Sequence, residues 1–221
     1  MKKVDDVLKD AREAYDKLDY STSLENYIWL YDNLLKIDES YVGMRYRVVL
    51  REWKKLGYQY KPAFEAMIDK TYETYDHLQK EKSKELFWDY VHLCDILGES
   101  KQAVEEFSKY HDNNKSFAKE VFKFIRDILI NQKEWKLCSC YMSDTQYEYE
   151  RVLDVFDKCM DMNPINYEWA EDFKKGFIKD IENLCFILQE EQQEAKIENI
   201  LEQAYKDMSA RGHGKMKFLF E

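Results

Sequence analysis

The sequence predicts an all-α protein built from repeated helix hairpins, and three observations support this fold class. First, a motif recurs along the chain in which an aromatic or polar residue precedes a small residue by three positions and a large apolar residue follows four positions later. Its small residue falls at Ser23, Ala63 and Ala103, an even spacing of about forty residues that is typical of helical repeats. Second, the chain of 221 residues holds only 6 Gly and 2 Pro, too few for the turns of a β-sheet protein. Third, the favourable helix formers Leu, Lys and Glu are abundant.

Apolar residues spaced by three and four positions predict the helices one by one. The first half of the chain is expected to form three antiparallel hairpins, from helices over residues 4–18 and 21–37, 40–56 and 62–78, and 84–97 and 101–110. Ser21 and Ser40 are the residue type that caps a helix N-terminus, and Pro62 suits a first helical turn, where its missing donor is not needed. Gly57 and Gly98 are expected to end their helices, because glycine readily adopts the conformation of a C-terminal cap.

The helices are expected to be less regular beyond residue 112. They are predicted over residues 116–131, from Glu134 as a short partner helix, over 144–162 and 167–188, and after Glu190. Gly212 and Gly214 are expected to end the last helix, and a tail that contains Phe218 and Phe220 follows. Such an apolar tail is expected to pack on the last hairpin rather than dock into a partner. The whole chain, 1–221, is thus predicted as a single helical repeat domain with regular hairpins in 1–112, less regular helices in 113–210 and a tail in 211–221.

Composition and charge limit the classes of function. A hydrophobic content of 45% allows a sizeable core, and the net charge of −10 comes without a clustered basic face. A nucleic-acid partner is therefore not expected, because phosphate binding needs concentrated positive charge. The most apolar stretch, Val121–Ile130, is interrupted by Lys123 and Arg126, so no membrane span is expected. Lys2 and Lys3 are followed by acidic residues and not by an apolar run, which predicts a cytoplasmic protein without a secretory segment.

The five cysteines predict free thiols and not a disulfide framework or a zinc site. Their number is odd, and their spacing matches neither kind of site. Cys138 falls where a repeat needs its small residue, so packing accounts for it without chemistry. No cofactor fingerprint and no nucleophile beside a base can be read in the chain, and no cofactor is expected.

Part of the chain resembles the tetratricopeptide repeat family. The segment that contains Ala11, Tyr15, Asp19, Tyr20, Ser23 and Tyr27 resembles one repeat, in which a small residue of the first helix faces a small residue of the second. Gly98, Ala103, Val104 and Phe107 resemble the turn and second helix of another repeat, and Trp135 with Cys138 is similar to the aromatic and small pair of a third. The resemblance implies hairpins stacked as a right-handed superhelix whose concave face binds a peptide or protein.

The chain also departs from the family pattern at several points. Arg51 stands where the first helix of the second hairpin should carry a small residue, and the closing proline of the first repeat is missing, with Glu39 in its loop. A repeat length near forty indicates longer helices than the family norm. The resemblance transfers partner-binding positions only to the first hairpin, where Asp10, Ala14 and Lys17 match positions that line the concave face in the family.

These observations predict a non-catalytic adaptor or scaffold that binds a protein or peptide. One alternative is a small acidic inhibitor of the immunity-protein kind, which would neutralise a basic partner through its net charge. The other is a helical metal-dependent hydrolase around Asp89, His92 and Asp95, which lie three residues apart on one predicted helix. A solvated helix face accounts for these three residues better, so no metal is expected. A homodimer is also considered, because an exposed terminal hairpin could pair with a second copy.

Overall fold

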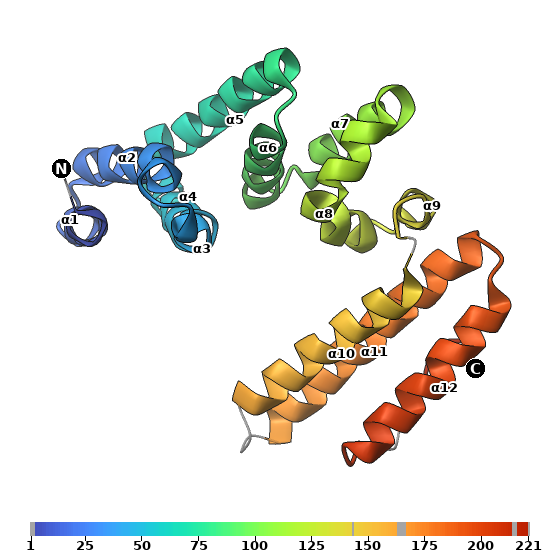
Figure 1. The fold of residues 1–221 in the computed structure, drawn as a ribbon. Helices are drawn as coiled ribbons and strands as arrows, with labels where there is room; N and C mark the ends of the chain where they lie inside the picture. The colour runs from blue at the N-terminus through green and yellow to red at the C-terminus, as the bar shows by residue number, and fades with distance from the viewer. Residues whose placement is uncertain (1–2, 143, 163–166, 214–215, 221) are drawn as a thin grey trace. The chain divides into compact units, whose positions relative to one another are not determined.

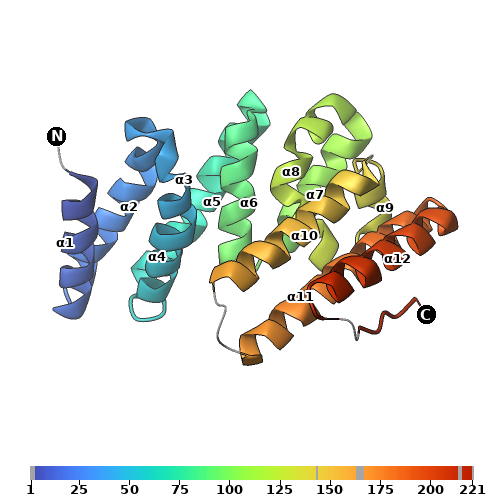
Figure 2. The ribbon, with the colours of Figure 1, turned by 60° about the horizontal axis from the view of Figure 1, so that its bottom comes forward.

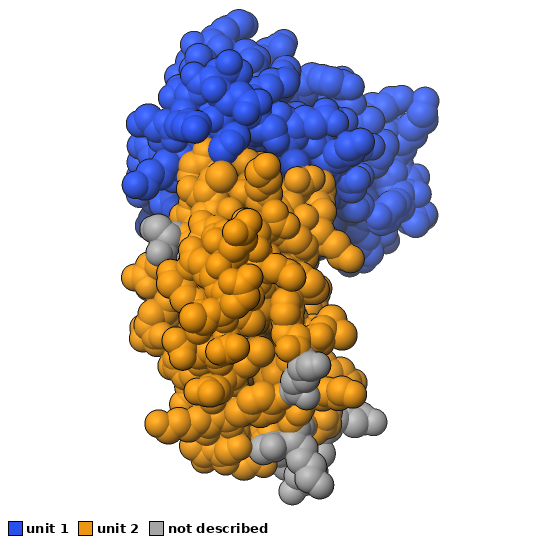
Figure 3. Space-filling model, turned by 90° about the vertical axis from the view of Figure 1, so that its right-hand side faces the viewer, with its two compact units in different colours: residues 1–125 blue, residues 126–221 orange. Residues whose placement is uncertain are grey.

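The computed structural model describes residues 3–142, 144–162, 167–213 and 216–220, and every regular element in these ranges is helical (Figures 1 and 2). The predicted all-α class is therefore confirmed. The chain divides into two compact units, Met1–Ile125 and Arg126–Glu221, which Figure 3 shows in blue and orange. Within the described ranges, none of the helices is both long and apolar enough to cross a membrane.

The first unit is built from the predicted hairpins. The helices α1 (Val4–Asp16) and α2 (Tyr20–Ile37) pack together, as do α4 (Leu50–Gly57) with α5 (Lys61–Glu81) and α6 (Lys84–Leu97) with α7 (Ser100–Asn113). The helix α8 (Lys115–Asn131) follows and continues into the second unit. Gly98 ends α6 with a φ of 84°, the left-handed conformation that glycine adopts without strain.

The small residue of the repeated motif is buried in all three hairpins. Ser23, Ala63 and Ala103 are each 0% exposed. The Ser23 hydroxyl donates a hydrogen bond of 2.9 Å to the Ala11 carbonyl oxygen across the α1–α2 contact. At the second hairpin the Trp53 indole donates a bond of 2.8 Å to the Ala63 carbonyl oxygen. A larger side chain at these positions would separate the helices, which explains why the sequence repeats a small residue there.

The expected single helix over residues 40–56 is instead a helical segment of mixed geometry. It begins with a 3₁₀ turn, η1 (Glu39–Tyr41), and passes through a short α3 (Val42–Met44) and a π-helical turn, η2 (Arg45–Val49), before α4. The Asp38 carboxylate caps its start by accepting from the Ser40 backbone N–H at 2.8 Å. Arg45 lies in this π turn and is buried, on the same stripe as Val49 and Trp53.

Two further details of the first hairpin correct the sequence prediction. Asp19, and not Ser21, caps α2, because the helix begins at Tyr20 and the Asp19 side chain accepts from the Thr22 backbone N–H. Leu18, expected in the buried stripe of the first helix, is 71% exposed with a φ of 63°. The helix α1 ends at Asp16, so Leu18 lies in the left-handed turn that reverses the chain.

The second unit contains α9 (Trp135–Ser139), α10 (Thr145–Met162), α11 (Tyr167–Glu190) and α12 (Glu194–Ala210). The long α11 is central, since it packs against each of the other three helices. The expected packing of the tail on its own chain is confirmed: Phe218 is 2% exposed against Tyr205, and Phe220 contacts Phe186. Gly212 has the positive φ expected of a glycine that ends a helix, whereas Gly214 lies outside the described residues.

The five cysteines are free, and three of them are buried as packing residues. Cys94, Cys138 and Cys185 are each 0% exposed, so the expected packing role of Cys138 agrees with its burial. Burial raises the pKa of each of these thiols to about 12, because a thiolate would lose its hydration. Cys140, in contrast, is exposed.

Candidate functional site

An open groove lies in the first unit, and we call it the Trp88 groove. Its volume is about 610 Å³, within the range of small-molecule and peptide sites. Its walls come from α2, the segment from η1 to η2, α6 and α8. The lining residues are Tyr31, Asp32, Leu35, Lys36, Glu39, Val42, Arg45, Tyr46, Lys84, Glu85, Trp88, Asp89, Lys123 and Phe124.

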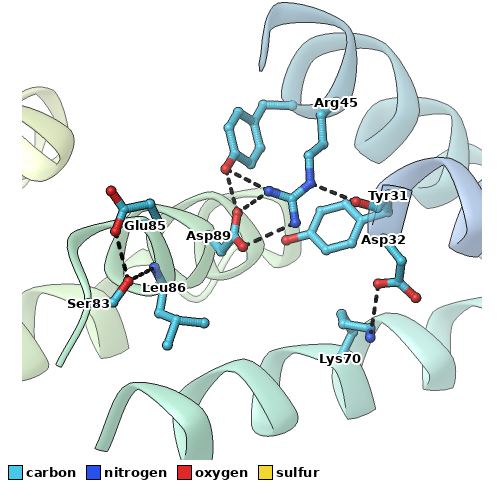
Figure 4. Close-up of polar contacts among 9 residues, drawn as sticks. Tyr31, Asp32, Arg45, Lys70, Ser83, Glu85, Leu86 and Asp89 are labelled. Carbon is cyan, nitrogen blue, oxygen red and sulfur yellow. Dashed lines mark hydrogen bonds and ion pairs between the residues drawn. The ribbon is translucent and has the colours of Figure 1, made fainter. Parts of the chain in front are cut away.

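A buried ion pair forms the floor of this groove (Figure 4). The Arg45 guanidinium donates to both Asp89 carboxylate oxygens, through Nη1 at 2.5 Å and Nη2 at 3.1 Å, and through Nε to the Tyr31 carbonyl oxygen at 2.8 Å. The Tyr46 hydroxyl also donates to Asp89. The guanidinium carbon lies 4.0 Å from the centre of the Tyr31 ring. The Arg45 and Asp89 side chains are only 9% and 16% exposed, so this pair joins hairpins two and three in a largely dry environment.

Burial and charge shift the ionisation of the floor residues. Burial alone would lower the pKa of Arg45, but the neighbouring Tyr31 and Asp89 raise it overall, so the guanidinium stays charged. Burial, reinforced by the Asp89 charge, raises the pKa of Tyr46 and of Tyr31 above the ordinary tyrosine value. Both hydroxyls therefore remain protonated donors at neutral pH.

One polar atom of the floor has no partner within the described structure. The Tyr31 hydroxyl is buried and makes no hydrogen bond, although Figure 4 shows it directed toward Asp89. The Tyr31 side chain is 2% exposed, and an unsatisfied buried hydroxyl is unfavourable.

Aromatic rings form the wall beside the ion pair. Trp88 stacks on Phe124, with ring centres 4.7 Å apart and planes inclined by 17°. Tyr46 lies 5.2 Å from Trp88 and stacks on His92 at 4.0 Å. Burial lowers the pKa of His92, so the ring that stacks on Tyr46 is neutral at pH 7.

Charged side chains line the rim of the groove. Lys84 lies 3.7 Å from the Glu85 carboxylate, and Asp32 lies 3.2 Å from Lys70, which is outside the groove. The Lys123 ammonium lies 4.9 Å from the centre of the Phe124 ring. An apolar wall, a polar floor and a charged rim are the features of a surface that recognises a segment of mixed chemistry.

The residues transferred from the family resemblance do not belong to this groove. Asp10 and Lys17 are exposed on or next to α1, and Lys17 donates to Glu13 at 3.3 Å. Ala14 is 7% exposed and packs in the first hairpin, so its side chain is not presented to a partner. The cavity beside α1 is smaller, about 250 Å³, and is lined by Arg12 and Tyr15 together with residues of α2 and α4.

The three residues weighed as a metal site have other roles. Asp89 is bound by Arg45 and Tyr46, His92 stacks on Tyr46, and Asp95 accepts from the Ser100 hydroxyl at 2.9 Å. Within the described parts of the chain, no group of three or more His, Cys, Asp or Glu residues is placed to hold a metal ion.

Arg45 is a residue of the candidate site that the sequence analysis did not predict. The pattern did contain a signal, because Arg45 stands between Met44 and Tyr46 in a segment rich in apolar residues. Comparisons with known proteins add no further evidence: no protein-family model matches the chain, and no curated protein or solved structure is significantly similar to it.

Proposed function

We propose that the chain is a non-catalytic, tetratricopeptide-like helical repeat module that binds a peptide or protein segment in the Trp88 groove and acts as an adaptor or scaffold. The observation that carries this proposal is the composition of the groove, in which successive repeats contribute to one open cavity of about 610 Å³. A helical repeat protein uses such a surface because each hairpin adds its own side chains to it.

The position of the groove in the repeats supports a peptide ligand. The segment from η1 to η2 belongs to the first helix of the second hairpin, α6 is the first helix of the third, and α8 follows the third hairpin. The second helix of the first hairpin, α2, completes the groove with four lining residues. In the family that the chain resembles, these first helices line the concave face. The Trp88–Phe124 pair offers an apolar seat for a side chain, and the rim charges can fix the orientation of a peptide.

The arrangement of the floor favours binding over catalysis. Arg45 and Asp89 neutralise one another, and Asp89 also accepts from Tyr46. A carboxylate held in this way is a poor general base, because its lone pairs are engaged by strong donors. The rigid ion pair instead keeps the two hairpins, and so the groove walls, in register. The five free thiols fit a reducing compartment, and we place the module in the cytoplasm.

A peptide-display selection tests the proposal. The full chain is used to select binders from a random peptide library, and the affinity of each recovered peptide is measured by fluorescence anisotropy for three variants. Trp88→Ala removes the ring against which a peptide side chain would pack. This substitution is expected to weaken peptide binding about tenfold or more, as is usual for an aromatic anchor. Lys123→Glu changes the exposed rim without touching the core, and should change the affinity in a direction set by the peptide charge.

The matched control is Lys101→Glu, which makes the same charge change at an exposed position of α7 outside the groove. Circular dichroism verifies that each variant is folded. Peptides whose affinities are unchanged in both groove variants would show that binding occurs elsewhere, and the proposal would then be wrong. Failure to recover any specific peptide would also contradict it.

A further inference from the structure

A second cavity lies elsewhere in the first unit, and we call it the Glu106 groove. It has a volume of about 390 Å³ and is formed by α5, α6 and α7, with no residue in common with the Trp88 groove. Its lining residues are Thr71, Tyr72, Tyr75, Tyr90, Gln102, Glu105, Glu106 and Lys109. Two carboxylates and three tyrosines thus face one space.

A buried carboxylate lies at the base of this groove. The Glu106 residue is 2% exposed, and its oxygens accept from the Gln79 amide at 2.6 Å, the Lys109 ammonium at 2.9 Å and the Tyr75 hydroxyl at 3.2 Å. Burial raises the pKa of this carboxyl, but the bonds from Lys109 and Gln79 outweigh it and leave the pKa below its ordinary value. The group is therefore a fixed negative charge that has little contact with water.

Lys109 shows where a cation binds in this groove. Its ammonium contacts the Glu106 carboxylate, lies 3.4 Å from the Tyr75 hydroxyl oxygen, and lies 5.9 Å from the centre of the Tyr75 ring. A carboxylate combined with an aromatic face is the environment that favours an ammonium or guanidinium group. The Lys109 side chain itself is 60% exposed, so a small rotation of its stem would take it into solvent.

The Glu106 carboxylate is expected to bind the Lys109 ammonium more weakly than it would bind an arginine side chain. Only the lysine end of this pair is exposed, so solvent competes for the ammonium, and the long side chain loses entropy when it is held against the carboxylate. Arginine binds a carboxylate through two parallel N–H bonds and stacks on aromatic rings, which a lysine ammonium does not do. An external arginine can therefore compete with Lys109 for Glu106.

We propose that the Glu106 groove is a second binding site, which takes an arginine side chain of a partner protein in place of the Lys109 ammonium. Charge complementarity supports this occupant: the chain carries a net charge of −10, and the exposed Glu105 adds a second carboxylate to the groove. Tyr72 is 64% exposed at the groove and offers a further aromatic face. The site is independent of the Trp88 groove, so one proposal can fail without the other.

Titration of the ¹⁵N-labelled full chain with acetyl-arginine methylamide, followed by NMR, tests this site. Backbone amide shifts are expected at Tyr72, Tyr75 and Glu105, and not at Trp88. The decisive variant is Lys109→Ala. Because it removes the competing ammonium, it should bind the probe about two- to fivefold more tightly than the unchanged chain, whereas a purely structural role for Lys109 predicts no such gain. Glu106→Gln should abolish the shifts.

Two controls keep the test independent of misfolding. Acetyl-citrulline methylamide has nearly the same shape as the probe but no charge, and it should produce no shifts. Lys119→Ala removes an exposed lysine outside the groove and should leave the affinity unchanged. If Glu106→Gln does not fold, the comparison of Lys109→Ala with Lys119→Ala still decides. Equal affinity in those two variants, equal shifts with citrulline, or shifts confined to the Trp88 groove would each overturn the proposal.

Discussion

Replacing Asp89 by leucine would remove the counterion of Arg45 while keeping the volume of the side chain similar. The guanidinium would lose its two bonds to the carboxylate, and the Tyr46 hydroxyl would lose its acceptor. Arg45 would retain its bonds to the Tyr31 carbonyl oxygen and, at 3.0 Å, to the Tyr46 hydroxyl oxygen. Since the Arg45 side chain is only 9% exposed, water cannot readily replace what is lost.

The expected loss is large because an uncompensated charge would remain buried. Removal of one partner of a buried ion pair typically lowers the free energy of unfolding by about 3–5 kcal/mol. The 16% exposure of the Asp89 side chain places our expectation at the lower end, about 3 kcal/mol. In the double variant Arg45→Met, Asp89→Leu no charge is left, so the free energy of unfolding should return to within about 1–2 kcal/mol of that of the unchanged chain.

Urea unfolding followed by circular dichroism measures these differences. Hydrogen exchange of the α6 backbone assigns the transition to the first unit if the two units unfold in separate steps. Asp154→Ala is the control, because it breaks an ion pair with Lys158 whose side chains are 57% and 70% exposed, and it should change stability far less. If Asp89→Leu unfolds like the unchanged chain, or if the double variant is less stable than Asp89→Leu alone, the reasoning about a buried charge is refuted.

Three further predictions concern packing, thiol chemistry and the tail. Ala103→Leu should lower the free energy of unfolding by about 1–3 kcal/mol, because the position is fully buried, whereas Lys101→Leu on the exposed face should not, and urea unfolding compares the two. At pH 8, Cys140 should react with a disulfide reagent well before the three buried thiols, and uniform labelling of all thiols in the folded protein would contradict their burial. The free energy of unfolding should also fall as the pH rises from about 9 towards 12, because thiols in the unfolded chain ionise near 9 and the buried ones near 12. Phe218→Ala should lower the thermal midpoint, whereas Leu219→Ala, at a position 76% exposed, should not; equal midpoints would contradict packing of the tail on its own chain.

Local pattern was sufficient to predict most of the helices. The spacing of apolar residues places α2, α6, α8 and α10 close to their observed bounds, because an amphipathic helix carries its period in its own sequence. The helix caps were less predictable. Asp19 and Asp38 compete with the neighbouring serines for the same backbone donors, and the outcome depends on the residue at which the helix begins.

The contacts of the candidate site could not be predicted from the local sequence pattern. Arg45 and Asp89 are 44 positions apart, and each resembles an exposed charge of a helix surface when it is considered alone. The sequence pattern singled out Asp89 only as part of a possible metal site with His92 and Asp95. In the structure these three side chains have different partners. Packing of the second and third hairpins decides the outcome, because it brings the Arg45 guanidinium to the Asp89 carboxylate of α6.

The sequence by itself determined that this protein is helical, where most of its helices lie, and which small residues, Ser23, Ala63 and Ala103, the hairpins bury at their contacts. These properties depend on neighbours three or four positions away, so they can be read along the chain. Only the tertiary structure decided which charges meet. The Arg45–Asp89 pair, the Trp88–Phe124 wall and the Glu106 carboxylate depend on contacts between different helices, and those contacts are set by packing and burial that no local period encodes.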